Sequence, residues 1–225
     1  MRIGVMCLPV FVCLAVSAAS AASPEPANED QKTLYTLGVA ISQSLANFSL
    51  SESELEFVKA GITDGVLNRK PKVDTQTFMP KVQKLQQARV AVLAEKEKKA
   101  GEAYLAKAAS VKGATKTASG IVIRTMKEGK GASPKETDTV KVHYHGTLTN
   151  GTVFDSSVQR GEPATFPLAQ VIPCWTEGVQ RVKVGGKSRL ICPANLAYGD
   201  RGAPPKIKPG ATLVFEVELL DIVKK

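Results

Sequence analysis

The chain has 225 residues, 43% of them hydrophobic, which is enough for one large domain or for two small ones with separate cores. Its formal net charge is +9. The basic residues are spread along the chain and form no dense run beside aromatic residues, so the composition gives little support to nucleic-acid binding.

Residues 1–22 have the features of a secretory signal peptide. Arg2 gives the positive start, residues 5–16 are an apolar run too short to span a bilayer, and residues 17–22 are small. We expect cleavage after position 21 or 22 and a periplasmic protein. Lipidation at Cys13 is disfavoured because this cysteine lies inside the apolar run, although association with the outer membrane stays open. No other segment is suited to stable membrane insertion.

Two helices are predicted after a Pro-rich and acidic lead-in. In 34–48, apolar residues recur at spacings of three and four, which is typical of one helical face. A second helix is predicted over 51–68. Ser51 is suited to cap it, and Glu54 completes a capping box three residues later.

A third, much longer helix is predicted to begin between Asp74 and Pro80 and to run to about Val111. After Val92 it loses its apolar stripe, which is typical of a helix that bridges two domains. An ordinary amphipathic helix folded back on a core is the alternative. The two shorter helices offer too little surface to bury such a partner, so we expect a homodimer formed through the N-terminal helices.

The second half is rich in Val, Ile, Thr and Phe, and it predicts an α+β fold with an antiparallel β-sheet and one short helix, over 176–182, covering one face. Asn150-Gly151 is a strong hairpin signal. The strands are expected at 121–126, 138–146, 152–155, 187–192 and 211–222. The predicted division of the chain is a signal peptide at 1–22, a helical dimerisation domain with its long connecting helix at 23–111, a linker at 112–119 and a catalytic domain at 120–225.

Metal and cofactor chemistry have weak support in the residues. His143 and His145 lie two apart, on one face of a predicted strand, but no third ligand is in view. No paired acid and base or activated nucleophile indicates a hydrolase. The segment 129–131 (Gly-Lys-Gly) lacks the phosphate-loop pattern. We therefore expect neither a metal nor a cofactor.

Cleavage of the signal peptide would leave two cysteines, Cys174 and Cys192. The chain is expected in an oxidising compartment, so these two residues are predicted to form a disulfide. Two separate buried thiols, packing as small hydrophobic groups, are the alternative.

From position 140 onward the sequence resembles the FKBP family of peptidyl-prolyl cis-trans isomerases. The resemblance covers about 119–223, and its blocks occur in the family's order: Val142-His143-Tyr144-His145-Gly146, Phe154-Asp155-Ser156-Ser157, Val171-Ile172-Pro173-Cys174-Trp175, Val184-Gly185-Gly186, Ala197-Tyr198-Gly199 and 211–219. The helical first half with its signal peptide is similar to the bacterial subgroup that includes the macrophage infectivity potentiator proteins. In that subgroup the N-terminal helices form a homodimer, and a long helix carries each catalytic domain.

The resemblance implies a pocket with Trp175 as its floor, whereas spacing alone would make these aromatic residues ordinary core. The implied walls are Tyr144, Phe154, Phe166, Val171, Ile172 and Phe215. Asp155 and Tyr198 would stand at the rim, with Arg160 as a basic partner for Asp155. The catalytic groups would be Asp155, the Tyr198 hydroxyl and the Ile172 N–H. Three positions depart from the family pattern: Ala164 replaces a frequent Phe and Ala203 a frequent His, while Cys174 replaces the usual Gly.

The implied activity is cofactor-free rotation of X–Pro bonds in unfolded or partly folded secreted proteins, together with help in their folding. The partners would be proline-containing polypeptides and a second copy of the chain. Macrolide inhibitors are a further implied ligand, and the more open pocket edge at Ala164 and Ala203 bears on their affinity. The alternative is a holdase that binds proline peptides on the same fold without catalysis.

Overall fold

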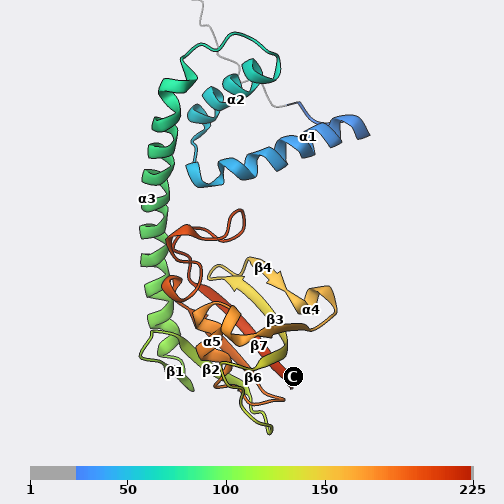
Figure 1. The fold of residues 1–225 in the computed structure, drawn as a ribbon, viewed down its shortest axis with the longest axis vertical. Helices are drawn as coiled ribbons and strands as arrows, with labels where there is room; N and C mark the ends of the chain where they lie inside the picture. Colours follow the sequence, from blue (N-terminus) through green and yellow to red (C-terminus); the bar gives the residue numbers. More distant parts are fainter. Residues whose placement is uncertain (1–23, 224–225) are drawn as a thin grey trace, which may run out of the picture. The chain divides into compact units, whose positions relative to one another are not determined.

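The computed structural model describes residues 24–223, and the chain divides into two units, residues 1–39 and 40–225 (Figure 1). The predicted signal peptide lies outside the described residues. Within the first unit, residues 29–39 belong to helix α1 (Glu29–Ser42). Leu34 and Leu37, on its predicted apolar face, are 66% and 56% exposed.

The second unit begins with a short 3-10 helix, η1 (Gln43–Phe48), and helix α2 (Glu52–Val66). The predicted capping box is confirmed. The Glu54 N–H donates to the Ser51 Oγ at 3.3 Å, and the Ser51 N–H donates to the Glu54 Oε2 at 2.9 Å. Each bond satisfies a donor that the first helical turn leaves without a partner.

The long helix α3 covers Thr75–Ala109. It begins at the early end of the predicted interval because the Asp74 carboxylate caps it, accepting a hydrogen bond from the Gln76 N–H at 3.0 Å. Pro80 lies inside the helix. Further along, the Arg89 guanidinium lies 2.5 Å from a Glu54 carboxylate oxygen and therefore ties α3 to α2.

The long helix connects the helical half to the β-rich half, as predicted, and its second part also packs against the β-rich half. Ala94, Gly101 and Leu105 are buried on that side. A methyl group added at Gly101 would lie 2.1 Å from the Thr212 Oγ1, so the backbone of the helix approaches this segment closely. The sequence obscured this face because two of its three contact residues are small and carry almost no hydrophobic signal.

Seven strands form one antiparallel sheet in the order β1-β2-β6-β7-β3-β4, with β5 paired to β3. The strands are β1 (Ala114–Lys116), β2 (Val122–Lys127), β3 (Thr139–Leu148), β4 (Val153–Ser156), β5 (Ala164–Pro167), β6 (Lys187–Cys192) and β7 (Leu213–Val223). The β3–β4 hairpin turns at the predicted Asn150-Gly151, where Gly151 has a φ of +88° that favours glycine.

Two strands were absent from the sequence-based prediction. The segment predicted as a linker, 112–119, contains β1, which pairs with β2. β5 pairs with β3 and brings Phe166 opposite Val140. Each strand has three or four residues, too few for a pattern of alternating hydrophobicity. Pairing with a longer neighbour, rather than local preference, therefore decides their conformation.

A short helix, α5 (Pro173–Val179), covers one face of the sheet (Figure 1). It begins three residues before the predicted 176–182, because Pro173 is well suited to the first helical position. The main core contains buried side chains of both elements, among them Trp175 and Val179 from α5 and Leu190 and Val217 from the sheet. The short helix α4 (Ser157–Arg160) follows β4, and three 3-10 helices complete this half: η2 (Leu168–Gln170), η3 (Ala194–Leu196) and η4 (Gly199–Arg201).

Candidate functional site

A cavity of about 380 Å³ opens at one end of the core, where strands β3, β4, β5 and β7 approach α5. It is lined by Tyr144, Phe154, Asp155, Phe166, Gln170, Val171, Ile172, Trp175, Tyr198 and Phe215. The lining is mostly apolar, with a few polar groups, which is typical of a binding site for a small molecule or for a single side chain of a larger ligand.

Trp175 is the centre of the cavity's aromatic lining. It is only 4% exposed, and its ring meets those of Tyr144, Phe166 and Phe215 edge-on, with centroids 5.2, 5.7 and 5.4 Å away. Phe154 contacts Phe215 in the same way at 5.4 Å. Perpendicular contacts of this kind hold each ring in one orientation, so the box is rigid before any ligand binds.

The alternation of β3 places its residues around this box. Successive side chains of a strand point to opposite faces, so Tyr144 points into the core while His143 and His145 point to the other face. Gly146 follows on the inner side, and a methyl group there would lie 2.7 Å from the Phe154 ring. A glycine at this position therefore leaves the space that the Phe154 ring occupies.

Three polar side chains are joined at the rim. The Tyr144 hydroxyl and the Arg160 guanidinium each donate a short hydrogen bond to Asp155, one to each carboxylate oxygen. The Arg160 Nη2 also donates to the Tyr144 hydroxyl at 3.0 Å. This closed set holds the carboxylate in one orientation beside the aromatic box.

The same contacts decide how these groups ionise. Burial alone would raise the pKa of Asp155, but the hydrogen bonds from Tyr144 and Arg160 outweigh it, so the pKa lies below its ordinary value. Burial raises the pKa of Tyr144, and its bond to the Asp155 carboxylate adds to the effect. The rim therefore carries a carboxylate anion, a neutral phenol and a guanidinium cation at neutral pH.

Two hydrogen-bond donors at the edge of the cavity have no partner among residues 24–223. One is the Tyr198 hydroxyl, whose side chain is 41% exposed at the rim, and the other is the backbone N–H of Ile172 just before α5. The buried Trp175 Nε1 also has no partner within this range. The cavity thus offers donors to a ligand carbonyl.

The two histidines of β3 make local contacts on the opposite face. The His143 Nδ1 lies 3.1 Å from the Ser157 Oγ, and the His145 Nδ1 lies 3.0 Å from the Ser156 Oγ. Over the described part of the chain, no group of three or more His, Cys, Asp or Glu side chains is arranged to hold a metal ion. In the same residues, no helix is long and apolar enough to cross a membrane.

Comparison with known proteins identifies the family. The profile of the FKBP-type peptidyl-prolyl cis-trans isomerases matches residues 130–220, and that of the domain amino-terminal to such isomerases matches residues 30–124. The isomerase FkpA of Aeromonas hydrophila is 43% identical over 92% of this chain and 81% of its own length. The chain belongs to the FKBP-type peptidyl-prolyl cis-trans isomerase family.

Two further comparisons extend the match beyond the FKBP-type domain. FkpA of Escherichia coli strain K12 is 40% identical over 94% of this chain and 83% of its own length. The crystal structure of FkpA from Escherichia coli matches 87% of this chain and 97% of that one, with a TM-score of 0.66 and 38% identity. The similarity therefore includes the helical first half, as the sequence predicted.

Besides its pocket, this FKBP-type domain contains the predicted disulfide. Cys174 of α5 and Cys192 at the end of β6 are joined, with their Cα atoms 5.7 Å apart, and both are fully buried. The bridge connects the residue immediately before Trp175 to the strand that leads toward the Tyr198 loop. The alternative of two separate thiols is therefore wrong.

The structure brings together all but one of the side chains that the FKBP resemblance implied for the pocket. Arg160 is the exception, since it does not line the cavity and acts on it only through Asp155 and Tyr144. Gln170 lines the cavity but was absent from the prediction. Gln170 is the last residue of η2 and directly precedes Val171. This position next to a predicted wall residue is the one signal in the sequence that could have suggested it.

Proposed function

We propose that the aromatic cavity catalyses rotation about X–Pro bonds in unfolded or partly folded polypeptides. The observation that carries the proposal is the rigid apolar box around Trp175, with two unpartnered donors at its edge. The pyrrolidine ring of proline is compact and apolar, so it fits such a box. No metal or cofactor is needed, because rotation breaks no σ-bond.

The chemistry follows from the origin of the barrier. Amide resonance imposes about 18–20 kcal/mol on rotation, and the planar amide is more charge-separated than the twisted one. Transfer from water into an apolar cavity therefore costs the planar state more. Catalysis requires that the site bind the twisted amide better than either planar isomer. The cavity achieves this by excluding water from the bond that rotates.

The polar groups are proposed to position the twisted amide. The Ile172 N–H and the Tyr198 hydroxyl would donate to carbonyl oxygens of the bound segment, and Asp155 would orient the rim and set the local field. Tyr144, Phe154, Phe166, Val171, Trp175 and Phe215 would contact the proline. Arg160 would keep Asp155 ionised and in place.

We also propose a location and an assembly. Residues 1–22 have the pattern of a signal peptide, which supports a periplasmic protein. Phe57, Val66 and Val92, from α2 and α3, are 81%, 73% and 69% exposed, which supports a homodimer formed by the helical domain. Two pockets in one dimer would be able to reach one unfolded client together.

A protease-coupled prolyl peptide assay tests the catalytic proposal. Asp155→Ala and Tyr198→Phe should each lower kcat/KM roughly fivefold or more, since one hydrogen bond contributes about 1 kcal/mol and about 1.4 kcal/mol is a factor of ten. Tyr35→Phe removes a hydroxyl in α1, far in sequence from the pocket residues, and should leave the rate unchanged. EDTA should have no effect.

The outcomes separate catalysis from the alternative of a non-catalytic holdase. If the wild type accelerates no isomerisation but still suppresses aggregation of an unfolded client, the chain is a holdase. If the wild type is active and both pocket variants keep full activity, the roles assigned to Asp155 and Tyr198 are wrong.

A further inference from the structure

A second cavity, of about 260 Å³, lies where the end of α3 meets the sheet. Ala108, Val122 and Ile191 contribute apolar surface to it, and its charged lining side chains are Lys107, Arg124 and Arg189. Tyr104, Val111 and Ala114 complete the lining, and we call this cavity the basic groove.

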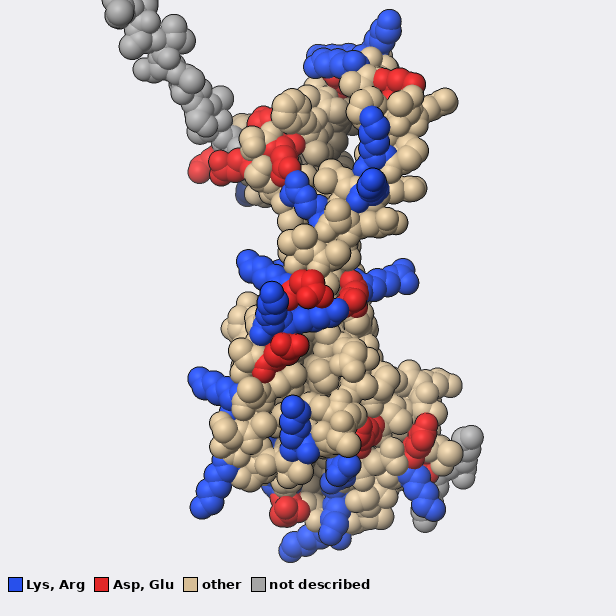
Figure 2. All heavy atoms as spheres, turned by 90° about the vertical axis from the view of Figure 1, so that its left-hand side faces the viewer, with Lys and Arg blue, Asp and Glu red and all other residues tan. Residues whose placement is uncertain are grey.

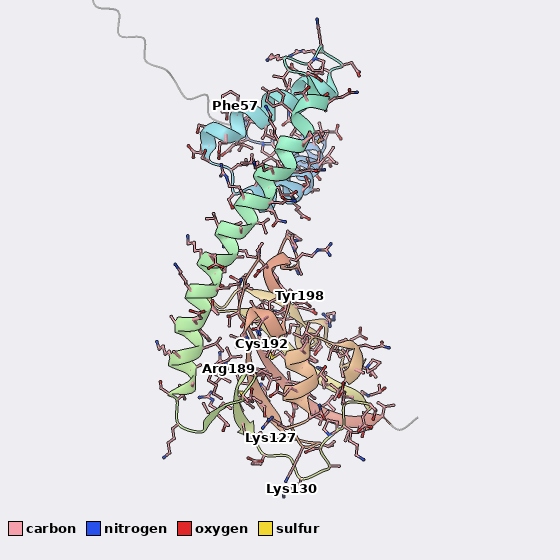
Figure 3. All side chains as sticks on the ribbon, turned by 60° about the vertical axis from the view of Figure 1, so that its left-hand side comes forward. Phe57, Lys127, Lys130, Arg189, Cys192 and Tyr198 are labelled. Carbon is pink, nitrogen blue, oxygen red and sulfur yellow. A yellow bond between two sulfur atoms is a disulfide. The ribbon has the colours of Figure 1, made fainter. Side chains whose placement is uncertain are left out.

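The basic groove lies on the opposite face of the sheet from the isomerase pocket. Ile191 and Val214 pack with Leu105 of α3 in one buried cluster, whereas their neighbours Leu190 and Phe215 belong to the main core beside the pocket. Adjacent residues of a strand point to opposite faces. Figure 3 shows Arg189 beside the lower part of α3 and apart from Tyr198. A ligand can therefore occupy the groove without entering the pocket.

All charged side chains that line the groove are basic. No Asp or Glu lines it, and Lys107, Arg124 and Arg189 form no ion pair within residues 24–223. The carboxylate of Glu216, which lies opposite Arg189 on β7, forms its ion pair with Lys187 at 2.7 Å and also interacts with the charge of Arg189.

An unsatisfied donor lies in the same place. The Nε of Arg189 is buried and has no acceptor among the described residues, which is costly for a charged group. Figure 2 shows that Lys and Arg predominate over Asp and Glu on the lower part of the face that α3 presents. Apolar surface surrounded by unpaired cations is complementary to an apolar group carried between anions.

We propose that the basic groove binds an acidic segment of a polypeptide, as a second client-binding site besides the isomerase pocket. One bulky apolar side chain would lie on Tyr104, Ala108 and Val111, which are half-buried or exposed, and flanking carboxylates would pair with Arg124, Arg189 and Lys107. An extended peptide also suits the border of the groove. Ala114 belongs to both the cavity lining and β1, an edge strand with one side open to pairing. The proposal rests on the proposed function only in that the clients are polypeptides.

Fluorescence anisotropy on the full chain tests this site with a proline-free, fluorescein-labelled octapeptide that has a central Leu-Phe pair between acidic residues. We expect saturable binding that weakens as salt increases. Arg124→Glu should raise the Kd at least tenfold, and Val111→Asp, at an exposed position of the cavity lining, should also weaken binding. An excess of a proline-containing isomerase substrate should not displace the peptide.

Lys130→Glu is the matched control, because it makes the same change of charge at an exposed position outside the cavity (Figure 3). Equal weakening by Lys130→Glu and Arg124→Glu would show a general charge effect and overturn the site. Absence of peptide binding, or binding only to vesicles of anionic phospholipid, would also overturn it. Isomerase activity of the same samples, measured separately, shows whether a failure concerns the groove or the proposed function.

Discussion

Asp155 shows how single side chains give this pocket its character. Its carboxylate would be costly to place beside aromatic rings without compensation, and the bonds from Tyr144 and Arg160 supply that compensation. Arg160 follows Asp155 by five residues, across the short helix α4. The polar rim is therefore largely a local structure, built by one strand end and one helical turn.

The disulfide is the second feature at the residue scale, and it is expected to stabilise the catalytic domain. Its cysteines are 18 positions apart, and the entropy lost by closing a loop of about this length raises the free energy of the unfolded chain by about 3 kcal/mol in the chain-entropy model. Dithiothreitol or Cys192→Ser should therefore lower the denaturant midpoint of the domain. Thiol titration of unreduced, denatured mature protein should find no free thiol. Two free thiols would contradict the disulfide.

At the scale of elements, the contact between α3 and the catalytic half depends on a glycine. Gly101→Ala should destabilise the protein by about 1–3 kcal/mol, because the added methyl group collides with the buried Thr212. Gly61→Ala in α2 is the matched control. Nothing lies within 4 Å of its added methyl, so it should stabilise by about 0.5–1 kcal/mol. Denaturant unfolding measures the change in the free energy of unfolding for both variants. If both variants were stabilised, or both destabilised, the close contact at Gly101 would be contradicted.

The contact between α2 and α3 should depend on acidity. The hydrogen bonds from Arg89 and Ser51 lower the pKa of Glu54 from 4.5 to about 2. A lowered carboxyl pKa contributes stability that is complete above the unfolded value and is lost as the pH falls through the folded one. The stability difference between the wild type and Arg89→Gln should therefore be constant above pH 4.5 and shrink toward pH 2. Thermal unfolding over this range measures it, and a difference that grows in acid would contradict the pairing.

At the scale of the whole molecule, the exposed apolar residues of the helical half imply assembly. Light scattering on the mature protein should give twice the monomer mass, whereas a fragment of residues 93–225, which lacks Phe57, Val66 and Val92, should be monomeric. The fragment keeps Ala94, Gly101 and Leu105, which pack on the catalytic half, and removes α1 and α2. A monomeric mature protein at micromolar concentration would contradict the proposed dimer.

Much of this molecule could be predicted from the sequence because its signals are local. The Ser51 and Glu54 capping box, the Asp74 cap and the Asn150-Gly151 turn each depend on residues within one turn of the chain. The order of the FKBP blocks then indicated the family and most of the pocket lining. Such features need only short-range sterics and hydrogen bonds, which a sequence shows directly.

Only the tertiary structure decided the features that depend on distant partners. β1 and β5 are too short to have a pattern of their own, and they form because β2 and β3 offer free backbone groups. The contact face of α3 is made by Ala94 and Gly101, whose small size becomes meaningful only beside the segment that approaches them. The basic groove likewise combines side chains from α3, β2 and β6. Packing between segments far apart in the chain decides each of these, and no local pattern records it.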